Sequence, residues 1–416
     1  MKVVSCETHI VATPPPHVGG MYWIFVVIKS DCGITGIGEV YAASFHPTVM
    51  EKAIEDVFDR YLKGYDPHHI ERFFREAYSS GFTQRPDLTM MGVVSALEMA
   101  CWDIIGKAAN KPVYELIGGR VHDKLRSYTY LYPIDRDGSY NYDNLELAME
   151  CAQQNMDLGF TALKFDPAGP YSAYSGHQIS LEALEKSAAF CEGIRQVVGN
   201  KCDLLFGTHG QMTPASAIRL AKRLEPFDPL WFEEPVPPGQ SEAMARVAVN
   251  TSIPVATGER LTTKYEFHDV LKHNAASIIQ MNLGRVGGIL EAKKIAAIAE
   301  VYYAQIAPHL YNGPVGAAAS IQLATATPNF LIQESMMTWD GFHAEVLEEK
   351  IDWQKGYIIP STKPGLGITL NMDVVRNASP YKSKALHLSM DAKPYDYVEQ
   401  SNTRWKDTPQ GSLGDA

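Results

Sequence analysis

The sequence predicts an α/β protein in which a (β/α)8 barrel follows a smaller α+β domain, and three observations support this prediction. Short apolar segments alternate with helix-period segments between Phe160 and Glu334, which is typical of a parallel sheet covered by helices. With a further segment at 125–132, the apolar segments number eight, enough to close a barrel. The chain has 416 residues, whereas a barrel needs about 250, so a second domain is expected.

The expected strands share one property, because each apolar run stops at a polar group. Beyond 125–132 they lie at 161–166, 203–209, 231–235, 255–259, 278–282, 306–309 and 331–334. Helical periodicity separates them, for example at 215–224 and 289–304. Active sites of such barrels lie at the carboxyl ends of the strands, so these polar residues are the candidate site.

The first 121 residues show a different pattern, which predicts an α+β capping domain. Runs at 21–29 and 34–42 flank the turn 30–33 and predict a β-hairpin. Helical periodicity follows at 48–62 and 88–108. Three prolines at 14–16 precede Gly19 and Gly20, which suits either a lid over the barrel mouth or an ordinary connector.

The chain is expected to divide into a capping domain at 1–121, a barrel at 122–345 and a C-terminal segment at 346–416 that packs back on the capping domain. The tail beyond Ser379 is polar and weakly patterned. It is expected either to form an arm on a neighbouring subunit or to be partly disordered.

Composition excludes several classes of function. Apolar residues make up 45% of the chain and charged residues 20%, as in a globular protein with a large core. The net charge of -11 disfavours nucleic-acid and anionic-membrane partners but permits a small anionic substrate in a cationic or metal-lined pocket. Six scattered cysteines, no export signal and no apolar run near about 18 residues predict a cytoplasmic protein that spans no membrane.

Glutamates end two neighbouring predicted strands, at Glu233 and Glu259. Two buried carboxylates at one site repel each other unless a proton or cation intervenes, and Mg2+ prefers oxygen ligands. Histidines end two other strands, at His209 and His309. A metal ion flanked by two acid/base groups suits proton abstraction next to a carboxylate.

The sequence resembles the enolase superfamily, mandelate racemase subgroup, over nearly its whole length, and within it the galactonate and mannonate type of acid-sugar dehydratase. His209-Gly210 and Glu334 carry the likeness to the dehydratases. The segments that carry the family resemblance are 95–107, 116–119, 231–235, 257–259, 284–288 and 308–309.

The resemblance implies a role for each candidate residue. Glu233 and Glu259 match the second and third ligands of one Mg2+ ion, and His309 matches the catalytic base. His209 matches the acid that assists departure of hydroxide, Glu334 a residue that binds substrate oxygen, and Lys164 the first lysine of a Lys-x-Lys pattern. The implied reaction removes the C2 proton of a small sugar acid and the 3-hydroxyl, giving a 2-keto-3-deoxy acid. A homo-oligomer is also implied, and substrate specificity is expected to come from the loops at 17–22 and 82–87.

Three positions depart from the family pattern. Gly207 stands where the first metal-binding aspartate belongs, Asn282 where an aspartate should orient His309, and Asp166 at the second lysine position. We expect Asp166 to substitute as a metal ligand and the Asn282 amide oxygen to accept a hydrogen bond from the ring of His309. Without the negative charge of an aspartate, His309 is expected to be a weaker base.

Several alternatives remain open on the sequence alone. Glu233 and Glu259 could pair with Arg260 or Arg285, Lys164 could pair with Asp166, and Glu334 could be structural. A chain with an impaired metal site could serve as a ligand-binding sensor. A pair of histidines could also serve a racemase or epimerase.

Overall fold

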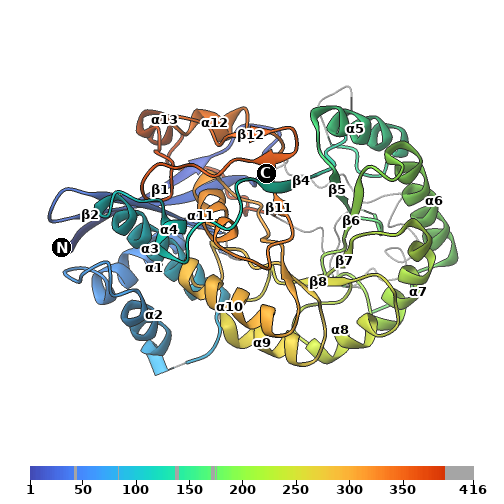
Figure 1. Ribbon diagram of the computed structural model, residues 1–416, viewed down its shortest axis with the longest axis horizontal. Coiled ribbons are helices and arrows are strands. Elements are labelled where there is room, and N and C mark those ends of the chain that lie inside the picture. The colour runs from blue at the N-terminus through green and yellow to red at the C-terminus, as the bar shows by residue number, and fades with distance from the viewer. Residues whose placement is uncertain (42–44, 83, 136–139, 170–173, 175, 389–416) are drawn as a thin grey trace.

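The computed structural model describes residues 1–41, 45–82, 84–135, 140–169, 174 and 176–388. The N-terminal domain is a three-stranded antiparallel sheet covered by helices (Figure 1). The predicted hairpin is confirmed as β2 and β3, whereas β1 and α2 were not predicted. The elements are β1 (Val3–Ala12), β2 (Tyr22–Ser30), β3 (Thr35–Val40), α1 (Pro47–Tyr61), α2 (Ile70–Ser79), α3 (Leu88–Ala108) and α4 (Val113–Leu116).

Helix α3 is the core helix of the capping domain and has the predicted bounds. The Asp87 side chain caps it by accepting a hydrogen bond from the Met90 N–H at 2.7 Å. Strand β3 lies against it through Gly36 and Gly38, where a Cβ atom would come within 2.0 Å of Ala100 O and 1.8 Å of Ala96 O. By length and apolar composition α3 could cross a membrane, contrary to our expectation, but 78% of its most apolar window is buried inside the protein.

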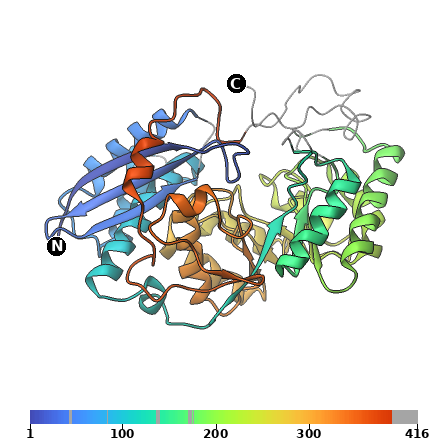
Figure 2. The ribbon, with the colours of Figure 1, turned by 90° about the horizontal axis from the view of Figure 1, so that it is seen from above.

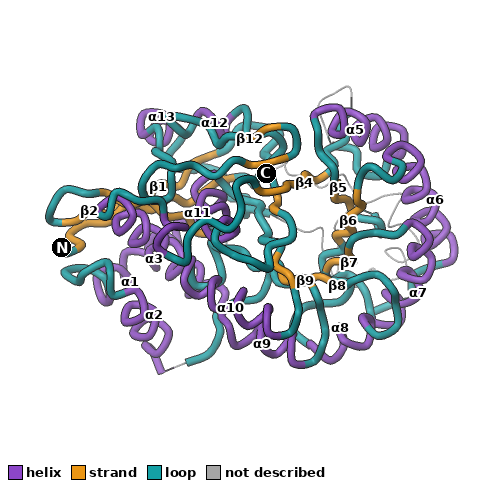
Figure 3. Tube along the Cα trace, viewed as in Figure 1, coloured by secondary structure: helices purple, strands orange, loops and turns teal. Residues whose placement is uncertain are grey.

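The predicted barrel is confirmed, with helices outside a ring of strands (Figure 3). Strands β4 to β10 pair in sequence order and in parallel, and β11 pairs with β4. A parallel bridge between Ile306 and Phe330 links β10 to the segment before β11. The strands are β4 (Leu125–Tyr130), β5 (Ala162–Phe165), β6 (Asp203–Gly207), β7 (Trp231–Glu233), β8 (Val255–Thr257), β9 (Ile278–Ile279), β10 (Gln305–Ile306) and β11 (Gln333–Glu334).

The outer helices match the predicted alternation, including the predicted segments at 215–224 and 289–304. They are α5 (Leu145–Leu158), α6 (Leu181–Val198), α7 (Pro214–Leu224), α8 (Ser241–Ala248), α9 (Thr263–Lys272), α10 (Ile289–Val301) and α11 (Pro314–Thr325). The first strand, β4, is separated from β5 by α5, and the same order repeats round the ring.

The barrel interior is closed by one apolar layer to which each strand segment contributes a residue. The layer consists of Tyr128, Ala162, Leu205, Trp231, Ala256, Ile278, Ala307 and Ile332. Since side chains alternate along a strand, the residues two positions further on also face the interior. This places the next layer toward the carboxyl ends of the strands, where the polar residues lie.

The C-terminal segment contacts both domains. Strand β13 (Tyr357–Ile358) pairs antiparallel with β4 of the barrel and with β12 (Trp353–Gln354). Helix α13 (Met372–Asn377) lies across β1 (Figure 2), and the short α12 spans Phe342–Glu345. The Tyr381 N–H donates to the Ile10 carbonyl at 2.9 Å, and the Met21 N–H donates to the His387 carbonyl at 3.2 Å. The tail beyond Ser379 was expected to form an arm or to be partly disordered, but residues 380–388 pack on the capping domain through these two hydrogen bonds. Residues 389–416 lie outside the described residues.

Candidate active site

A layer of polar side chains lies directly above the apolar layer. Two positions beyond the apolar residues come Lys164, Gly207, Glu233, Gln280, His309 and Glu334. They are buried, with Lys164 and Glu233 each only 1% exposed. Buried charges are stable only where they are paired or hydrogen-bonded, so the partner of each charge defines the chemistry of the site.

Lys164 and Glu233 form the central ion pair. The Lys164 Nζ lies 2.7 Å from Glu233 Oε1 and 3.7 Å from Glu334 Oε1. Burial lowers the pKa of Lys164, but the surrounding carboxylates outweigh this effect and hold the pKa above its usual range, so the amine is an ammonium ion. The alternative pairing of Lys164 with Asp166 is therefore wrong.

Glu233 is held by three donors rather than one. Its Oε2 accepts hydrogen bonds from Trp231 Nε1 at 3.1 Å and from Gln280 Nε2 at 2.8 Å, while Oε1 faces Lys164. Gln280 was not among the predicted site residues, although its position two residues before Asn282 places both side chains on one face of the strand.

Gly207 leaves the space through which Lys164 reaches Glu233. Gly207 is the register partner of Glu233 across β6 and β7, and Lys164 lies on β5 on the other side of β6. A Cβ atom at position 207 would lie 2.8 Å from Lys164 Cε and 3.2 Å from His209 Cε1. The lysine stem therefore crosses β6 where a ligand side chain would begin.

Asn282 fixes the orientation of His309 in the sense opposite to our expectation. The Asn282 Oδ1 accepts from the Gly284 N–H at 2.9 Å, and Nδ2 donates to the His309 carbonyl at 3.3 Å. Since an N–H only donates and a carbonyl only accepts, Nδ2 must be the atom that faces His309 Nδ1 at 3.1 Å. Asn282 donates to the ring rather than accepting from it.

The opposite ring nitrogen of His309 faces a carboxylate. His309 Nε2 lies 3.1 Å from Glu259 Oε2 and 3.9 Å from Glu334 Oε2. Burial lowers the pKa of His309 to about 3, so the ring is neutral. With Nδ1 accepting from Asn282, the neutral ring carries its proton on Nε2 and donates toward Glu259.

Glu334 combines structural and site contacts. Its Oε2 accepts from the Leu310 N–H at 2.7 Å, and its Oε1 faces Lys164. Burial raises the pKa of Glu334 to about 7, although Lys164 opposes the rise. The carboxyl is thus placed beside both Lys164 and His309, as expected for a group near bound substrate.

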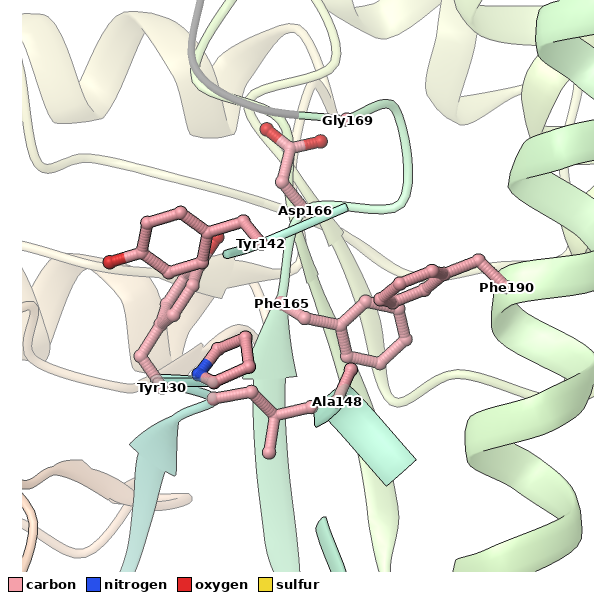
Figure 4. Close-up of a pocket in the computed structure, with 9 residues that line it drawn as sticks. Tyr130, Tyr142, Ala148, Phe165, Asp166, Gly169 and Phe190 are labelled. Carbon is pink, nitrogen blue, oxygen red and sulfur yellow. The ribbon is translucent and has the colours of Figure 1, made fainter. Parts of the chain in front are cut away.

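Asp166 lies one layer further up and does not fill the space at Gly207. Its Oδ1 accepts from the Ala168 N–H at 2.8 Å, and its Oδ2 accepts from Gln211 Nε2 at 3.2 Å and lies 3.7 Å from His209 Nδ1. Figure 4 shows the carboxylate beyond the end of β5, directed away from the Phe165 and Phe190 rings. Two residues along a strand return to the same face but advance one layer, so Asp166 approaches His209 instead of Glu233.

The alternative of an arginine partner is confirmed for Glu259, which forms an ion pair with Arg260, whereas Glu233 pairs with Lys164 instead. Arg260 Nε donates to Glu234 Oε2 at 2.8 Å, not to Glu233, and lies 3.9 Å from Glu259 Oε1. Arg285 donates to the backbone carbonyl of Glu259 at 3.0 Å, and its guanidinium lies over the Tyr41 ring. Both place positive charge near Glu259, and Arg260 and Lys164 are among the groups that hold the pKa of Glu259 below its usual range despite burial.

These side chains do not fit the magnesium ion that is usual in the enolase superfamily. Within the described ranges, no group of three or more His, Cys, Asp or Glu side chains is arranged to hold a metal ion. Gly207 offers no donor, and the Glu233 carboxylate faces an ammonium ion. The expected set of Glu233, Glu259 and Asp166 is therefore not assembled, because Asp166 lies in a different layer and Lys164 holds Glu233.

The capping domain and the C-terminal segment meet beside the site, where the Tyr41 ring lies 5.5 Å from the His309 ring and 5.3 Å from the His387 ring. The Gly19 carbonyl accepts from Trp23 Nε1 at 3.0 Å, and a Cβ at Gly20 would lie 2.1 Å from His387 Nε2. His387 packs edge-on against Tyr41 and Tyr311. His387 was not among the predicted site residues, since it lies in the weakly patterned tail. Residue 83, in the second predicted specificity loop, lies outside the described residues.

Fold and site together define a class of protein, namely a capped (β/α)8-barrel enzyme with an enclosed, charged site at the carboxyl ends of its strands. The profile for the mandelate racemase / muconate lactonizing enzyme N-terminal domain matches residues 9–118. The profile for the enolase C-terminal domain-like family matches residues 146–374. The chain belongs to the enolase superfamily, in its mandelate racemase/muconate lactonizing enzyme group.

Individual relatives agree with this assignment. The chain is 34% identical to a D-galactonate dehydratase of Ralstonia pickettii over 90% of this chain and 94% of the relative. It is 32% identical to a D-xylonate dehydratase of Haloferax volcanii over 86% of each chain. A mandelate racemase/muconate lactonizing enzyme structure from Sulfitobacter sp. aligns with a TM-score of 0.92 and 52% identity, over 95% of this chain and all of that one. The protein is an enzyme, and the sensor alternative is not retained.

Proposed function

We propose that the protein is a sugar-acid dehydratase that converts an aldonate-type substrate into a 2-keto-3-deoxy acid. The observation that carries this proposal is the enclosed layer in which the Lys164 ammonium, the His309 imidazole and Glu334 face one another, with His209 one layer above. A carboxylate substrate needs positive charge beside it, and the reaction needs one proton acceptor and one proton donor. Relatives named dehydratases, about one third identical to this chain, support the same reaction class.

His309 is the proton donor in this proposal, rather than the base that the family resemblance implies. Its Nε2 carries the proton because Asn282 donates to Nδ1. A neutral imidazole with a protonated Nε2 can give its proton to a departing hydroxyl group, but that nitrogen has no lone pair to accept one. Asparagine in place of aspartate at position 282 thus makes the His309 ring a proton donor rather than a proton acceptor.

His209 is the proton acceptor. The Asp166 carboxylate lies 3.7 Å from its Nδ1, beyond hydrogen-bond range. Its negative charge nevertheless favours the tautomer that has its proton on Nδ1, the nitrogen nearer to the carboxylate. Burial holds the pKa of His209 well below its usual range, so the ring is neutral. Its Nε2 then has a lone pair available for the C2 proton.

The reaction is balanced with these two groups. The C2–H bond breaks, its proton passes to His209 Nε2, and the electron pair forms an enediolate on the substrate carboxylate. The electrons then return to form the C2–C3 double bond while the C3–O bond breaks, and the His309 Nε2 proton leaves with the hydroxyl group as water. This step leaves His309 as an imidazolate and His209 as an imidazolium ion, and transfer of the proton from His209 to His309 through solvent restores both neutral rings. The resulting enol becomes the 2-keto acid.

The magnesium ion expected from the family would supply positive charge to the enediolate. The side chains present do not fit it, so no step of the proposal depends on it. A cytoplasmic location, expected from the cysteines and the lack of an export signal, and a homo-oligomeric state, implied by the resemblance, remain parts of the proposal.

The experiment that tests the function has two parts. A panel of acid sugars is screened for 2-keto-3-deoxy acid, and a substrate so found is then incubated in D2O with variants of the two histidines. The His309→Gln variant should lose dehydration but still exchange the C2 proton for deuterium, whereas the His209→Gln variant should lose both. The opposite pattern would restore the roles implied by the family, and no product from any acid sugar would reject dehydratase function.

An epimerase remains the second candidate, because two neutral histidines lie in the site. It would invert C2 without forming a keto acid. Chiral analysis of the same D2O incubations distinguishes this outcome, since an epimerase gives deuterated substrate of both configurations.

A further inference from the structure

The position of Lys164 has a consequence beyond the proposed reaction. Lys164 starts on β5, passes over β6 at Gly207 and ends at Glu233 on β7. Its ammonium is therefore anchored by the glutamate that matches the second metal ligand, and its stem fills the space that the first ligand would need. Lys164 thus pairs with the residue that matches the second metal ligand and also occupies the space of the first ligand.

The glycine at position 207 is explained by the same contact. Its φ is not positive, so backbone conformation does not require glycine there. The position of Lys164 favours it instead, since a Cβ atom would lie 2.8 Å from Lys164 Cε and the end of the lysine would have to shift. A cation-binding aspartate at 207 would therefore compete for space with the lysine as it now lies across the strand.

The ammonium also has hydrogen-bonding capacity to spare. Lysine has three N–H donors, and among the residues that the structure describes only Glu233 accepts a hydrogen bond from it. Glu334 Oε1 lies 3.7 Å away, beyond hydrogen-bond range. The remaining N–H groups can therefore meet oxygen atoms of a substrate carboxylate.

We propose that Lys164 is the resident cation of this active site, that it replaces the divalent metal ion of the family, and that Glu233 is its counter-ion rather than a metal ligand. The inference extends the proposed function, because a fixed ammonium can stabilise the charge that develops on the substrate carboxylate. The substrate class that follows is a carboxylic acid whose carboxylate is bound directly by the Lys164 ammonium.

Metal binding itself tests this inference, without substrate, so that its failure is distinguishable from failure of the proposed function. The full-length chain, freed of metal with a chelator, is titrated with Mn2+ while the free ion is measured by electron paramagnetic resonance. Three proteins are compared: the wild type, the Lys164→Met/Gly207→Asp double variant, and a Lys264→Met control. Lys264 lies 2.9 Å from the buried Glu291, so the control also removes a lysine partner from a buried glutamate, which keeps Lys294 at 3.7 Å as Glu233 in the double variant keeps its other donors.

The wild type and the control should show no saturable Mn2+ binding at millimolar concentration. The double variant should gain a site for one Mn2+ per chain, from which Mg2+ displaces it, because three carboxylates then converge without the lysine. Wild-type binding of one Mn2+ per chain that Glu233→Gln abolishes would overturn the inference. So would a folded double variant, checked by circular dichroism, that binds no Mn2+. If the double variant fails to fold, the wild-type titration decides alone.

Discussion

The side-chain amide of Asn282 donates a hydrogen bond to Nδ1 of His309 across 3.1 Å, and backbone groups of Gly284 and His309 fix the direction of that amide. Asparagine has a nitrogen where aspartate has a second oxygen. This one atom therefore decides which nitrogen of the His309 ring carries the proton. Since the ring is buried and neutral, this choice determines whether Nε2 donates or accepts.

Replacing Asn282 with aspartate should reverse the tautomer. The new carboxylate accepts from Nδ1–H, so Nε2 loses its proton and can no longer act as the donor. We expect dehydration to fall by roughly 10²–10⁴-fold, the usual contribution of a positioned acid or base. Nitrogen NMR of labelled histidine should show the proton move from Nε2 to Nδ1.

The Asn371→Asp variant is the matched control, because Asn371 caps α13 through its Oδ1 and aspartate caps equally well. It should leave activity and the His309 signals unchanged. An Asn282→Asp enzyme that is as active as the wild type would contradict the donor role of His309.

A methyl group at Gly207 should disturb the central ion pair. Gly207→Ala brings Cβ to 2.8 Å from Lys164 Cε and displaces the ammonium from Glu233. Overpacking of this kind costs about 1–3 kcal/mol, which urea unfolding can measure. The control is Gly239→Ala, where no heavy atom lies within 4 Å of the added Cβ. Equal stability of the two variants would show that Lys164 moves aside without cost.

Glu39 of the capping domain should be essential for docking the barrel helix α11. Its carboxylate accepts from the Gly313 N–H at 2.6 Å and the Gly316 N–H at 2.8 Å, so it caps the helix from another domain. Glu39→Ala leaves both buried donors unpaired, which should cost about 2–4 kcal/mol. Glu39→Gln retains one acceptor and should lose less. Identical urea midpoints for both variants and the wild type would refute the capping role.

Acidification should destabilise the protein through His343, which packs between Trp23 and Trp339. Burial lowers the pKa of His343 to about 4. The unfolded chain then binds a proton below about pH 6.5 that the folded chain does not, so this contribution to stability is present at pH 7 and is lost as pH falls toward 4.

The comparison with His343→Asn isolates this effect. Between pH 7 and pH 5 the wild type should lose roughly 2 kcal/mol more unfolding free energy than the variant. Parallel stability curves for the two proteins, measured by urea unfolding across this range, would contradict a neutral buried His343.

The barrel and most of the site residues were predictable because the pattern of a strand and the residue at its end are properties of the local sequence. Period and apolar content identified β4 to β11 and α3, and the strand ends identified Lys164, Glu233, Glu259 and His309. Gly207 and Asn282 were recognised as departures only through the family resemblance, which supplied the aspartates expected at those positions. Strand β1 and helix α2 were missed, since partly exposed elements carry weaker patterns.

The partners of the charged groups were decided only by the tertiary structure. We expected Asp166 to replace the missing ligand at Gly207. A residue two positions along a strand lies in another layer, however, so Asp166 lies on the His209 side of the site. The sequence alone determined which groups reach the mouth of the barrel. The three-dimensional fold decided that Lys164 crosses a glycine to reach Glu233, because contacts between neighbouring strands depend on register, layer and side-chain length, which the chain order does not contain.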